Sequence, residues 1–350
     1  AIGQAAQVDV MSLAEGPMRK LLADPSLTLK PREEWPKRFK KARSMVTSPE
    51  ELYQIGHGLW KRRMVREVGR DELITDSEGN ILAGALFGIE KENEVPDHPD
   101  LFVLRLILNL VPPNEIQIKI SGDNQTLPYI GQWKNTNVQQ GDPVYLNSED
   151  MRACFNLFRL PPPWAVVFVI DEMMPGWVID KPLTDWVYIG MITVPMGWVN
   201  AVGVLQYLHR QLLKKVNVLP RHLELRRDAP MPVDEVFNTA SFVEIYVDNL
   251  DGFSVGGRKQ RQSMKDLVLA VRTTGEVLGV VYDDGDKRII DDHAIKTLGA
   301  DVQGRTKSAR PHAKKRGEVV DLTIYLLSQP VPSIKEAEIG EGVLVHVAQY

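Results

Sequence analysis

Apolar and polar positions along the chain change their spacing near residue 80. In residues 1–75, apolar residues recur at helical spacing between polar and basic faces, and prolines interrupt them at positions 17, 25, 31, 36 and 49. This pattern predicts short helices and connectors, an N-terminal basic helical extension. From residue 81, two strand-like apolar runs, 81–91 and 101–114, flank a polar segment with two prolines. The sequence predicts a hairpin there.

The rest of the chain alternates strand-like and helix-like segments. A helix and turn are expected to lead into the first strand, and a basic, helix-prone tail follows the last one. The order strand, helix, strand, strand, helix, strand predicts an α+β fold with helices on one face of an antiparallel sheet, for which a ferredoxin-like core is the candidate. The predicted strands are 143–150, 164–170, 186–194, 241–249, 277–285 and 293–302, and the predicted helices are 200–216 and 263–275.

Composition and charge narrow the function classes. The chain has 350 residues, 43% of them hydrophobic, enough to bury a sizeable core in two or three subdomains. Its net charge of -4 gives no overall attraction to nucleic acid. Basic residues gather instead in three stretches, 30–43, 61–70 and 305–316. Any binding to phosphate is therefore expected to come from these local patches.

Cysteine content and hydropathy indicate an intracellular protein. The single Cys154 excludes an intramolecular disulfide and a Cys-rich zinc site, and it fits a buried thiol in a reducing compartment. No apolar run reaches the roughly 18 residues of a membrane span, and no signal-peptide pattern opens the sequence. Cytoplasm and nucleus are not distinguished. Because the chain begins with Ala rather than Met, we expect a fragment of a longer polypeptide.

Two acidic residues end predicted strands. Asp248 follows the apolar run 242–247 and is expected at an exposed hairpin tip, and Asp150 ends the run 143–150. On adjacent central strands, two carboxylates would hold two Mg²⁺ ions that activate a 3′-hydroxyl and clamp a triphosphate. Spacing alone leaves a second interpretation open, in which Asp150 caps a helix and Asp248 makes a turn.

Five motif-like segments follow one another from about Phe87 to Val302. They are Lys91 with RLILNLVPPN (105–114), DMRACF (150–155), PMGWVNAVGVLQ (195–206), YVDN (246–249) and LGADV (298–302). In this order they resemble motifs of the retroelement-type reverse transcriptases, which belong to the right-hand group of polymerases. The matched motifs are the nucleotide-gripping strands, Asp-x-x-x-x-Phe/Tyr, Pro-x-Gly, Tyr-x-Asp-Asp and the primer grip.

The resemblance implies an RNA-directed DNA polymerase domain of a retrotransposon polyprotein, a nucleotidyltransferase. The implied architecture is fingers and palm, the palm built on the ferredoxin-like antiparallel sheet with helices on one face. After the extension 1–75, it predicts fingers at 76–145, a palm at 146–300 with a fingers insertion at about 163–190, and the start of a thumb or connection at 301–350. The implied partners are an RNA or DNA template with a primer, deoxynucleoside triphosphates and other domains of the polyprotein.

The resemblance also implies roles for the residues of the reaction centre. Asp150 and Asp248 would bind two Mg²⁺ ions, or Mn²⁺ in their place, and Asn249 completes the catalytic set. Lys91 and Arg105 would meet the triphosphate, the first as a point charge and the second as a fork of donors. Without the resemblance, these two cations would be interpreted as solvated charges on a strand pair.

Further positions would surround the nucleotide, primer and template. Phe155 would lie against the sugar and reject a 2′-hydroxyl by its bulk, although alone it would be an ordinary core aromatic. Lys296 would protonate the pyrophosphate leaving group, and otherwise would be a surface charge. Gly197 would let the backbone approach the new base pair, and Gln206 would face the template. The full assignment is Phe155, Met196, Gly197 and Gln206 for the nucleotide, and Trp198, Tyr246, Lys296, Leu298 and Gly299 for primer and template.

Three departures from the family pattern remove charge from the site. Asn249 and Asn109 replace Asp, and Val111 replaces Arg. A neutral amide is a poorer Mg²⁺ ligand than a carboxylate. Asp251 is expected on the far side of the turn, where it would not compensate.

Three hypotheses follow. The first is reverse transcription with reduced activity, with any RNase H beyond residue 350. The second is a catalytically weakened or inactive nucleic-acid-binding remnant of the same fold. The third is an unrelated α+β interaction domain.

Overall fold

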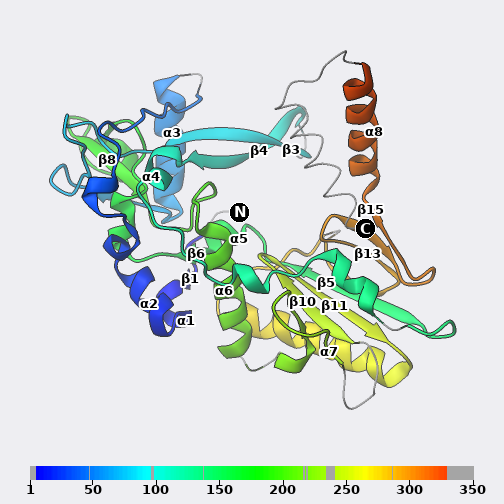
Figure 1. The fold of residues 1–350 in the computed structure, drawn as a ribbon. Coiled ribbons are helices and arrows are strands. Elements are labelled where there is room, and N and C mark those ends of the chain that lie inside the picture. Colours follow the sequence, from blue (N-terminus) through cyan, green and yellow to red (C-terminus); the bar gives the residue numbers. More distant parts are fainter. Residues whose placement is uncertain are drawn as a thin grey trace. The chain divides into compact units, whose positions relative to one another are not determined.

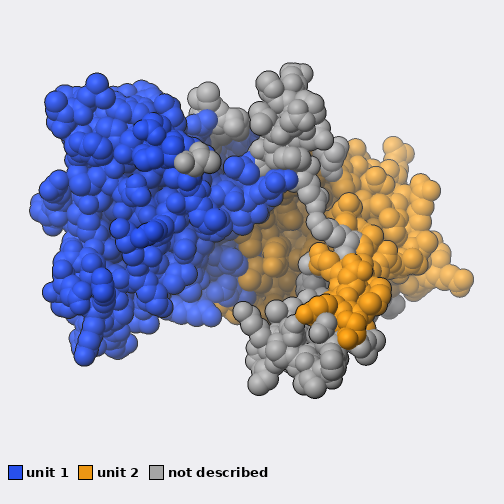
Figure 2. Space-filling model, turned by 90° about the horizontal axis from the view of Figure 1, so that it is seen from above, with its two compact units in different colours: residues 1–124, 152–215, 276–281 blue, residues 125–151, 216–275, 282–350 orange. Residues whose placement is uncertain are grey.

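The computed structural model describes residues 5–46, 48–95, 98–136, 138–215, 217, 220–233, 241–285 and 287–328. The chain forms two compact units, coloured blue and orange in Figure 2. Unit 1 comprises residues 1–124, 152–215 and 276–281, and unit 2 comprises residues 125–151, 216–275 and 282–350. Each unit thus combines segments that are distant in sequence. The four-part division predicted above stays a prediction. Within the described residues, every helix is too short or too polar to cross a membrane.

Unit 2 is built on a five-stranded sheet (Figure 1). Its strands are β5 (Val144–Asp150), β9 (Glu224–Leu225), β10 (Phe242–Tyr246), β11 (Asn249–Val255) and β12 (Ile289–Asp292), in the order β12-β5-β11-β10-β9. Neighbouring strands are antiparallel except β10 and β9. The predicted antiparallel sheet is therefore present.

One face of this sheet packs against helix α7 (Arg258–Val277). A Cβ added at Gly252 of β11 would lie 2.9 Å from the Met264 sulfur and 3.2 Å from a Val268 methyl. The absence of a side chain at Gly252 lets helix and sheet approach closely.

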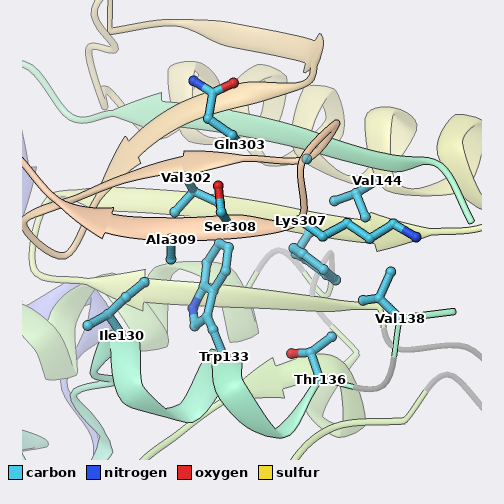
Figure 3. Close-up of a pocket in the computed structure, with 12 residues that line it drawn as sticks. Ile130, Trp133, Thr136, Val138, Val144, Val302, Gln303, Lys307, Ser308 and Ala309 are labelled. Carbon is cyan, nitrogen blue, oxygen red and sulfur yellow. The ribbon is translucent and has the colours of Figure 1, made fainter. Parts of the chain in front are cut away.

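The opposite face carries the apolar core of unit 2. Phe242 and Phe253, paired across β10 and β11, stack with ring centroids 4.6 Å apart, and both pack edge-on against Trp133. A second sheet, β13-β14-β15, contributes Ile295 to the same core. The elements over this face are η4 (Ile130–Asn135), β13 (Ala294–Thr297), β14 (Ala300–Gln303) and β15 (Ser308–Pro311), followed by α8 (Ala313–Ser328). Between η4 and β14–β15 lies a pocket of about 300 Å³, shown in Figure 3.

Unit 1 contains the predicted hairpin, formed by β3 (Ala85–Val95) and β4 (His98–Asn109). A three-stranded sheet of β2 (Val65–Val68), β8 (Trp186–Met191) and β7 (Met174–Pro175) and a short parallel pair of β1 (Val8–Asp9) and β6 (Phe158–Arg159) complete its strands. Its helices are α1 (Val10–Leu13), α2 (Gly16–Ala23), α3 (Pro49–Lys61), α4 (Val111–Glu115), α5 (Cys154–Leu157) and α6 (Ala201–Lys215). Its 3-10 helices are η1 (Pro25–Thr28), η2 (Arg32–Glu34), η5 (Pro162–Val166) and η6 (Gly176–Ile179). The helix η3 (Asn124–Thr126) crosses the sequence boundary of the two units, and η7 (Arg221–Leu223) belongs to unit 2.

Local sequence explains where α3 begins. The Ser48 hydroxyl accepts a hydrogen bond from the Glu51 amide at 3.2 Å, and Pro49 occupies the first turn. Both are favoured at a helix N-terminus, because the first amides lack intrahelical partners.

The strand predicted at 164–170 is wrong, since only Val169 and Ile170 form isolated bridges at its end. Residues Pro162–Val166 form η5, in which Trp164 stacks on Phe168 inside the core. Three consecutive prolines precede Trp164, and proline cannot donate to a strand ladder but fits the first turn of a helix. The apolar run is buried, as predicted, but in a different backbone conformation.

Two further strand predictions need correction. In the segment 277–285, α7 continues to Val277, and only Tyr282 forms an isolated bridge, with Met151. The sheet edge is β12, which the sequence did not predict. The segment 293–302 is a hairpin rather than one strand, because Leu298 (φ +47) and Gly299 (φ +81) form the turn between β13 and β14. Two residues with positive φ are typical of tight hairpin turns.

Candidate functional site

The end of β5 and the start of β11 bring polar residues together. Asp150 pairs with Asn249, and Asn249 pairs with Tyr246 on its other side. Paired residues of antiparallel strands direct their side chains to the same face. The Met151 amide donates to the Asp248 carbonyl at 2.9 Å, so Asp248 lies beside the end of β5. The two acids singled out from the sequence are therefore neighbours, where the end of β5 adjoins the β10–β11 turn.

The β10–β11 turn has an unusual backbone. Val247 and Asp248 connect Tyr246 to Asn249, and Val247 has φ +55. A β-branched residue rarely adopts this region, and such strain, on the order of 1–3 kcal/mol, is concentrated at functional sites. Asp248 is half-buried rather than fully exposed as expected from the sequence.

Beside these residues lies a hollow of about 620 Å³. Asp150 and Asn249 line it from the five-stranded sheet, and Lys296 and Asp301 line it from the β13–β14 hairpin, where they pair with each other. Lys287 lines it from the loop before β12. The hollow thus has polar residues of both charges on its walls.

Lys287 is the site residue that sequence reasoning missed. Its Nζ lies 2.7 Å from Asp150 Oδ2. The Lys287 side chain is 61% exposed, so this ion pair adds little to stability. Its effect is local, since the ammonium neutralises the carboxylate predicted to bind metal. The feature of the sequence that could have indicated Lys287 is the basic pair Lys287–Arg288 directly after an acidic turn.

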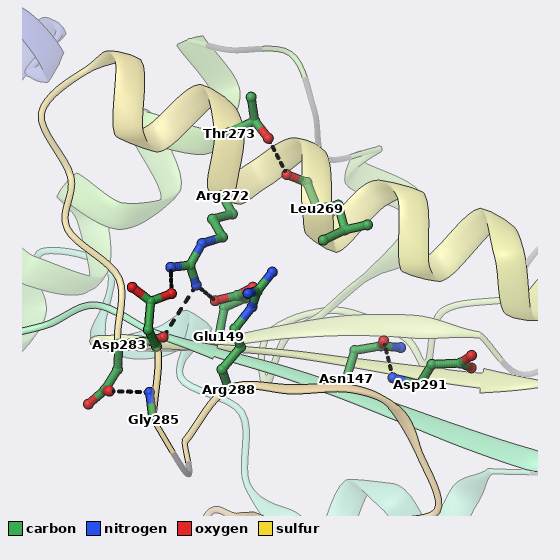
Figure 4. Close-up of polar contacts among 10 residues, drawn as sticks. Asn147, Glu149, Leu269, Arg272, Thr273, Asp283, Gly285, Arg288 and Asp291 are labelled. Atoms are coloured by element: carbon green, nitrogen blue, oxygen red, sulfur yellow. Dashed lines mark hydrogen bonds and ion pairs between the residues drawn. The ribbon is translucent and has the colours of Figure 1, made fainter.

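A buried ion-pair network lies on the α7 side of the same strand end (Figure 4). Glu149 is fully buried and accepts from Arg272 Nη1 at 2.8 Å and from Arg288 Nε at 3.3 Å. Arg272 also donates to the Asp283 carbonyl and pairs with Asp284. Burial raises the pKa of Glu149, and Arg272 opposes the shift. These contacts attach the loop that carries Lys287 to the strand that carries Asp150.

Two residues along the strands from Asn249 and Tyr246, on the same face of the sheet, the carboxyl groups of Asp251 and Glu244 are buried. Asp251 pairs with Glu244 and with Ser148, so it lies on the same face as Asn249, because side chains two residues apart share a face. Asp251 lies beyond the turn, as expected, but on the face of β11 that Asn249 also occupies. Trp133 Nε1 donates to Glu244 at 2.9 Å, and the Thr297 hydroxyl donates to it at 2.6 Å.

This acid pair retains a proton at neutral pH. Burial, followed by the charge of Asp251, raises the pKa of Glu244 to about 8. Burial also raises the pKa of Asp251 to about 6, and the charges of Asp150 and Asp248 act in the same direction. The Asp251 Oδ1 atom has no hydrogen-bond partner among the described residues. Two carboxylates buried side by side cannot both ionise readily, so one remains protonated.

The donor set of the site suits a hard cation that keeps most of its water. Asp150, Asp248 and Asn249 offer oxygen ligands, and Mg²⁺ in proteins is commonly held by one or two carboxylates. Over the described ranges, no group of three or more His, Cys, Asp or Glu side chains could hold a metal ion. Asp150 and Asp248 are the residues that would hold Mg²⁺, with the Asn249 amide as a neutral third donor.

The other predicted nucleotide contacts belong to unit 1. Arg105 is exposed on β4, opposite Ile89. Lys91 lies in β3, but its side chain is outside the described residues. Phe155 is half-buried in the short helix α5.

The segment around Gly197 is held tightly. Gly197 is exposed with φ +111, and an added Cβ would lie 2.2 Å from the Leu108 carbonyl oxygen, so only glycine fits. The carbonyl of half-buried Met196 accepts from the Leu108 amide at 3.2 Å. The segment is therefore fixed against β4.

Two predicted contact residues have core side chains. Trp198 is 4% exposed, packs against Trp164 and Phe168, and donates to Gln117 at 2.6 Å. Gln206 is fully buried in α6. We assign neither a direct contact with nucleic acid.

Apart from Trp198, the residues predicted for primer and template lie in unit 2. Tyr246 is 40% exposed beside Asn249. Lys296 is exposed in β13, and the Leu298–Gly299 turn follows, with Leu298 packed against the apolar core. The functional roles of these residues stay predictions.

Comparisons with known proteins find solved structures of similar fold, but no protein of similar sequence. No protein-family model and no curated protein sequence matches the chain. Among solved structures, it is similar to the foamy viral protease-reverse transcriptase dRH in complex with double-stranded DNA, with a TM-score of 0.52 and 11% identity over 94% of this chain and 48% of that chain. It is also similar to the foamy viral protease-reverse transcriptase in complex with an RNA/DNA hybrid, with a TM-score of 0.51 and 11% identity over 88% of this chain and 32% of that one. The chain spans half or less of these proteins and has a reverse-transcriptase-like fold.

Proposed function

We propose that this chain carries out template-directed DNA synthesis, as the fingers and palm of a retrotransposon reverse transcriptase. The observation that carries the proposal is the strand pairing that sets Asp150 opposite Asn249, with Asp248 in the adjoining turn. The strand order β12-β5-β11-β10 also corresponds to a ferredoxin-like palm. The reverse-transcriptase-like fold supports the same interpretation.

In this proposal, Asp150 and Asp248 hold Mg²⁺ at the strand ends. When bound, the ions would supply activation of the primer 3′-hydroxyl and neutralisation of the developing phosphate charge. Asp150 must first exchange its contact with Lys287 for the metal. The released ammonium then stays within reach of the site, where it can neutralise phosphate.

Residues of unit 1 would select the nucleotide. Arg105 and Lys91 present cationic groups to the triphosphate. Phe155 lies against the sugar and excludes a 2′-hydroxyl. In unit 2, Lys296 on the wall of the hollow donates a proton to the leaving pyrophosphate. The substrates are deoxynucleoside triphosphates with a primed RNA or DNA template, and the chain would act inside the cell within a longer polyprotein.

A second function, nucleic-acid binding without catalysis, has its own support. Asn249 supplies no charge opposite Asp150, and Lys287 already neutralises Asp150. A site in which a lysine takes the place of the metal charge would be stable without Mg²⁺. The same fold and basic patches would then serve only to bind template.

Primer extension on an RNA template separates the two functions. We expect the protein to extend a DNA primer in Mg²⁺ or Mn²⁺, and Asp150→Ala to abolish extension. The control is Asp266→Ala, which removes an exposed acid of α7 outside the hollow and should leave extension unchanged. No extension in either metal, with binding to the primed template retained, would establish the non-catalytic function.

A further inference from the structure

A basic segment of unit 1, residues 37–43, is fixed to the protein surface as a strap. Phe39 is 5% exposed and packs in a small core with Leu82 and Ile116. Ala42 is buried as well. These two inward side chains hold the strap without regular secondary structure.

Two carboxylates, Asp76 and Asp171, accept hydrogen bonds from Phe39 in the strap and from Ser44 just after it. Asp76 accepts from the Phe39 amide at 2.8 Å and also from the amides of Glu78 and Asn80. Burial, the largest single influence, raises the pKa of Asp76, but these hydrogen bonds together lower it to about 2. Just beyond the strap, Asp171 accepts from the Ser44 amide and hydroxyl, at 3.1 and 2.6 Å. The strap is therefore ordered before any ligand binds.

The remaining strap positions are five exposed cations. Arg38 pairs with exposed Glu78 at 3.5 Å, and Lys40 pairs with Glu115. In the described part of the chain, no ion pair is found for the other three, Lys37, Lys41 and Arg43. Their charges are available to an anionic ligand, although the whole chain has a net charge of -4.

A hollow of about 650 Å³ lies along the strap. Arg38, Lys40 and Lys41 of the strap line it, and so does half-buried Tyr188 of β8. The Asp171 carboxylate in the wall is already bonded to Ser44. Cations beside an accessible aromatic ring form the combination that binds single-stranded nucleic acid, with charges on phosphates and the ring under a base.

We propose that the strap and Tyr188 form a binding site for single-stranded nucleic acid, the unpaired part of a template. That the bound single strand is a template rests on the proposed function, whereas the binding of a single strand does not. An extended strap of seven residues covers up to about 20 Å, which matches a row of phosphates better than a single free anion. A ring inside a hollow reaches an unpaired base but not a base stacked in a duplex.

The test is the binding of a fluorescent single-stranded oligonucleotide to the full chain at several salt concentrations. The variant Lys37→Gln/Lys41→Gln/Arg43→Gln removes the three strap cations. The matched control Lys20→Gln/Lys119→Gln/Arg258→Gln removes the same charge from exposed positions elsewhere. We expect the strap variant to bind about 10- to 100-fold more weakly at 0.1 M salt, with a log–log salt slope smaller by about 2, because each lost phosphate contact lowers the slope by roughly 0.7. The control should bind like wild type.

Tyr188→Leu separates stacking from charge. Leucine keeps the packing that Tyr188 makes beside Val169 and removes the ring. We expect at least a fivefold loss for single strands and no change for duplex. The alternative is that the strap binds a free phosphate anion, and inorganic tripolyphosphate is added as a competitor to test it.

Each result decides the inference. Equal binding by the strap and control variants, or no binding by wild type, overturns it. The site binds free anions if tripolyphosphate displaces the oligonucleotide at the same phosphate concentration and Tyr188→Leu leaves the affinity unchanged. That pair of results also overturns the inference of a single-strand site. If the wild type binds through the strap but extends no primer, the inference stands and the polymerase proposal fails. If the strap variant binds like the control and extends a primer, the polymerase proposal stands and the inference fails.

Discussion

Asn249 is the residue whose replacement tests the proposed catalytic site most directly. It lies half-buried and opposite Asp150, so its side chain decides how much negative charge the strand ends present. Lys287 already compensates one carboxylate. Two carboxylates, Asp150 and Asp248, and one ammonium, Lys287, therefore lie at these strand ends, and Asn249 adds no charge.

Asn249→Asp should strengthen metal binding. A second carboxylate directly opposite Asp150 is expected to destabilise the metal-free protein by roughly 0.5–1 kcal/mol through like-charge repulsion. Mg²⁺ relieves that repulsion, so the thermal midpoint of the variant should rise with Mg²⁺ more than that of wild type. Primer extension should increase several-fold and only in part, because Asn109 and Val111 remain.

Asn135→Asp, an exposed change of equal charge, is the control for this experiment. An unchanged Mg²⁺ response in Asn249→Asp would show that this position is not a metal ligand. No extension by either protein would favour the non-catalytic function.

Glu244 makes stability depend on pH. Its pKa of about 8 in the folded protein is above its unfolded value of about 4.5, so the folded state binds the extra proton. This contribution is fully present below about pH 4.5 and is lost as pH rises through 8. Glu244→Gln removes the titration while keeping an acceptor for Trp133. Between pH 5 and 9, wild type should therefore lose more unfolding free energy than the variant, by a difference on the order of a few kcal/mol. Urea unfolding at both pH values measures it, and parallel losses in the two proteins would contradict the assignment.

Between elements, the buried pair of Glu149 and Arg272 joins β5 to α7. Both partners are at least 90% buried, so the pair is costly to break although its net contribution is small. Through Arg272 and Arg288 it also holds the loop of Lys287 near Asp150. The network therefore links the contacts of β5 with α7 on one face of the sheet to the position of Lys287 beside Asp150 on the other face.

A double-mutant cycle tests this connection. Arg272→Met should cost about 3 kcal/mol, because Glu149 then keeps only the Arg288 contact. The loss should be smaller at pH 5 than at pH 8, since the raised pKa of Glu149 lets it become protonated. Adding Glu149→Gln should recover part of the loss. Denaturant unfolding measures all four proteins, and additive losses would show that the two residues do not act as a pair.

Across the whole molecule, charge is distributed unevenly. The net charge is -4, yet 42 basic residues are present, many of them in the stretches 30–43, 61–70 and 305–316. Binding to a polyanion must therefore be local, and it must be opposed by the acidic remainder at low ionic strength.

Affinity for a primed template should fall steeply with salt. If the basic stretches contact about six phosphates, the affinity should drop by about three orders of magnitude between 50 and 200 mM salt, because bound cations release counterions. Fluorescence anisotropy at a series of salt concentrations measures the slope. Salt-insensitive binding, or none, would favour an interaction domain that does not bind nucleic acid.

The sequence was sufficient for features that local patterns control. Alternating or continuous apolar runs predicted β5, the β3–β4 hairpin and the β10–β11 turn, because strand periodicity and turn residues act over a few positions. Helical spacing predicted α6 and α7 in the same way, whereas the edge strands β9 and β12 were not predicted. Asp150 and Asp248 could be singled out because both end such runs.

Tertiary structure decided what depends on contacts between distant segments. Pairing register placed Asp251 on the same face as Asn249, and the loop before β12 brought Lys287 to Asp150, 137 residues away. Packing placed the side chains of Trp198 and Gln206 in the core, although the resemblance implied contacts with nucleotide, primer or template for both. Burial, rather than residue type, raised the pKa of Glu244. Register, burial and long-range ion pairs arise only when the strands assemble, so no local pattern encodes them.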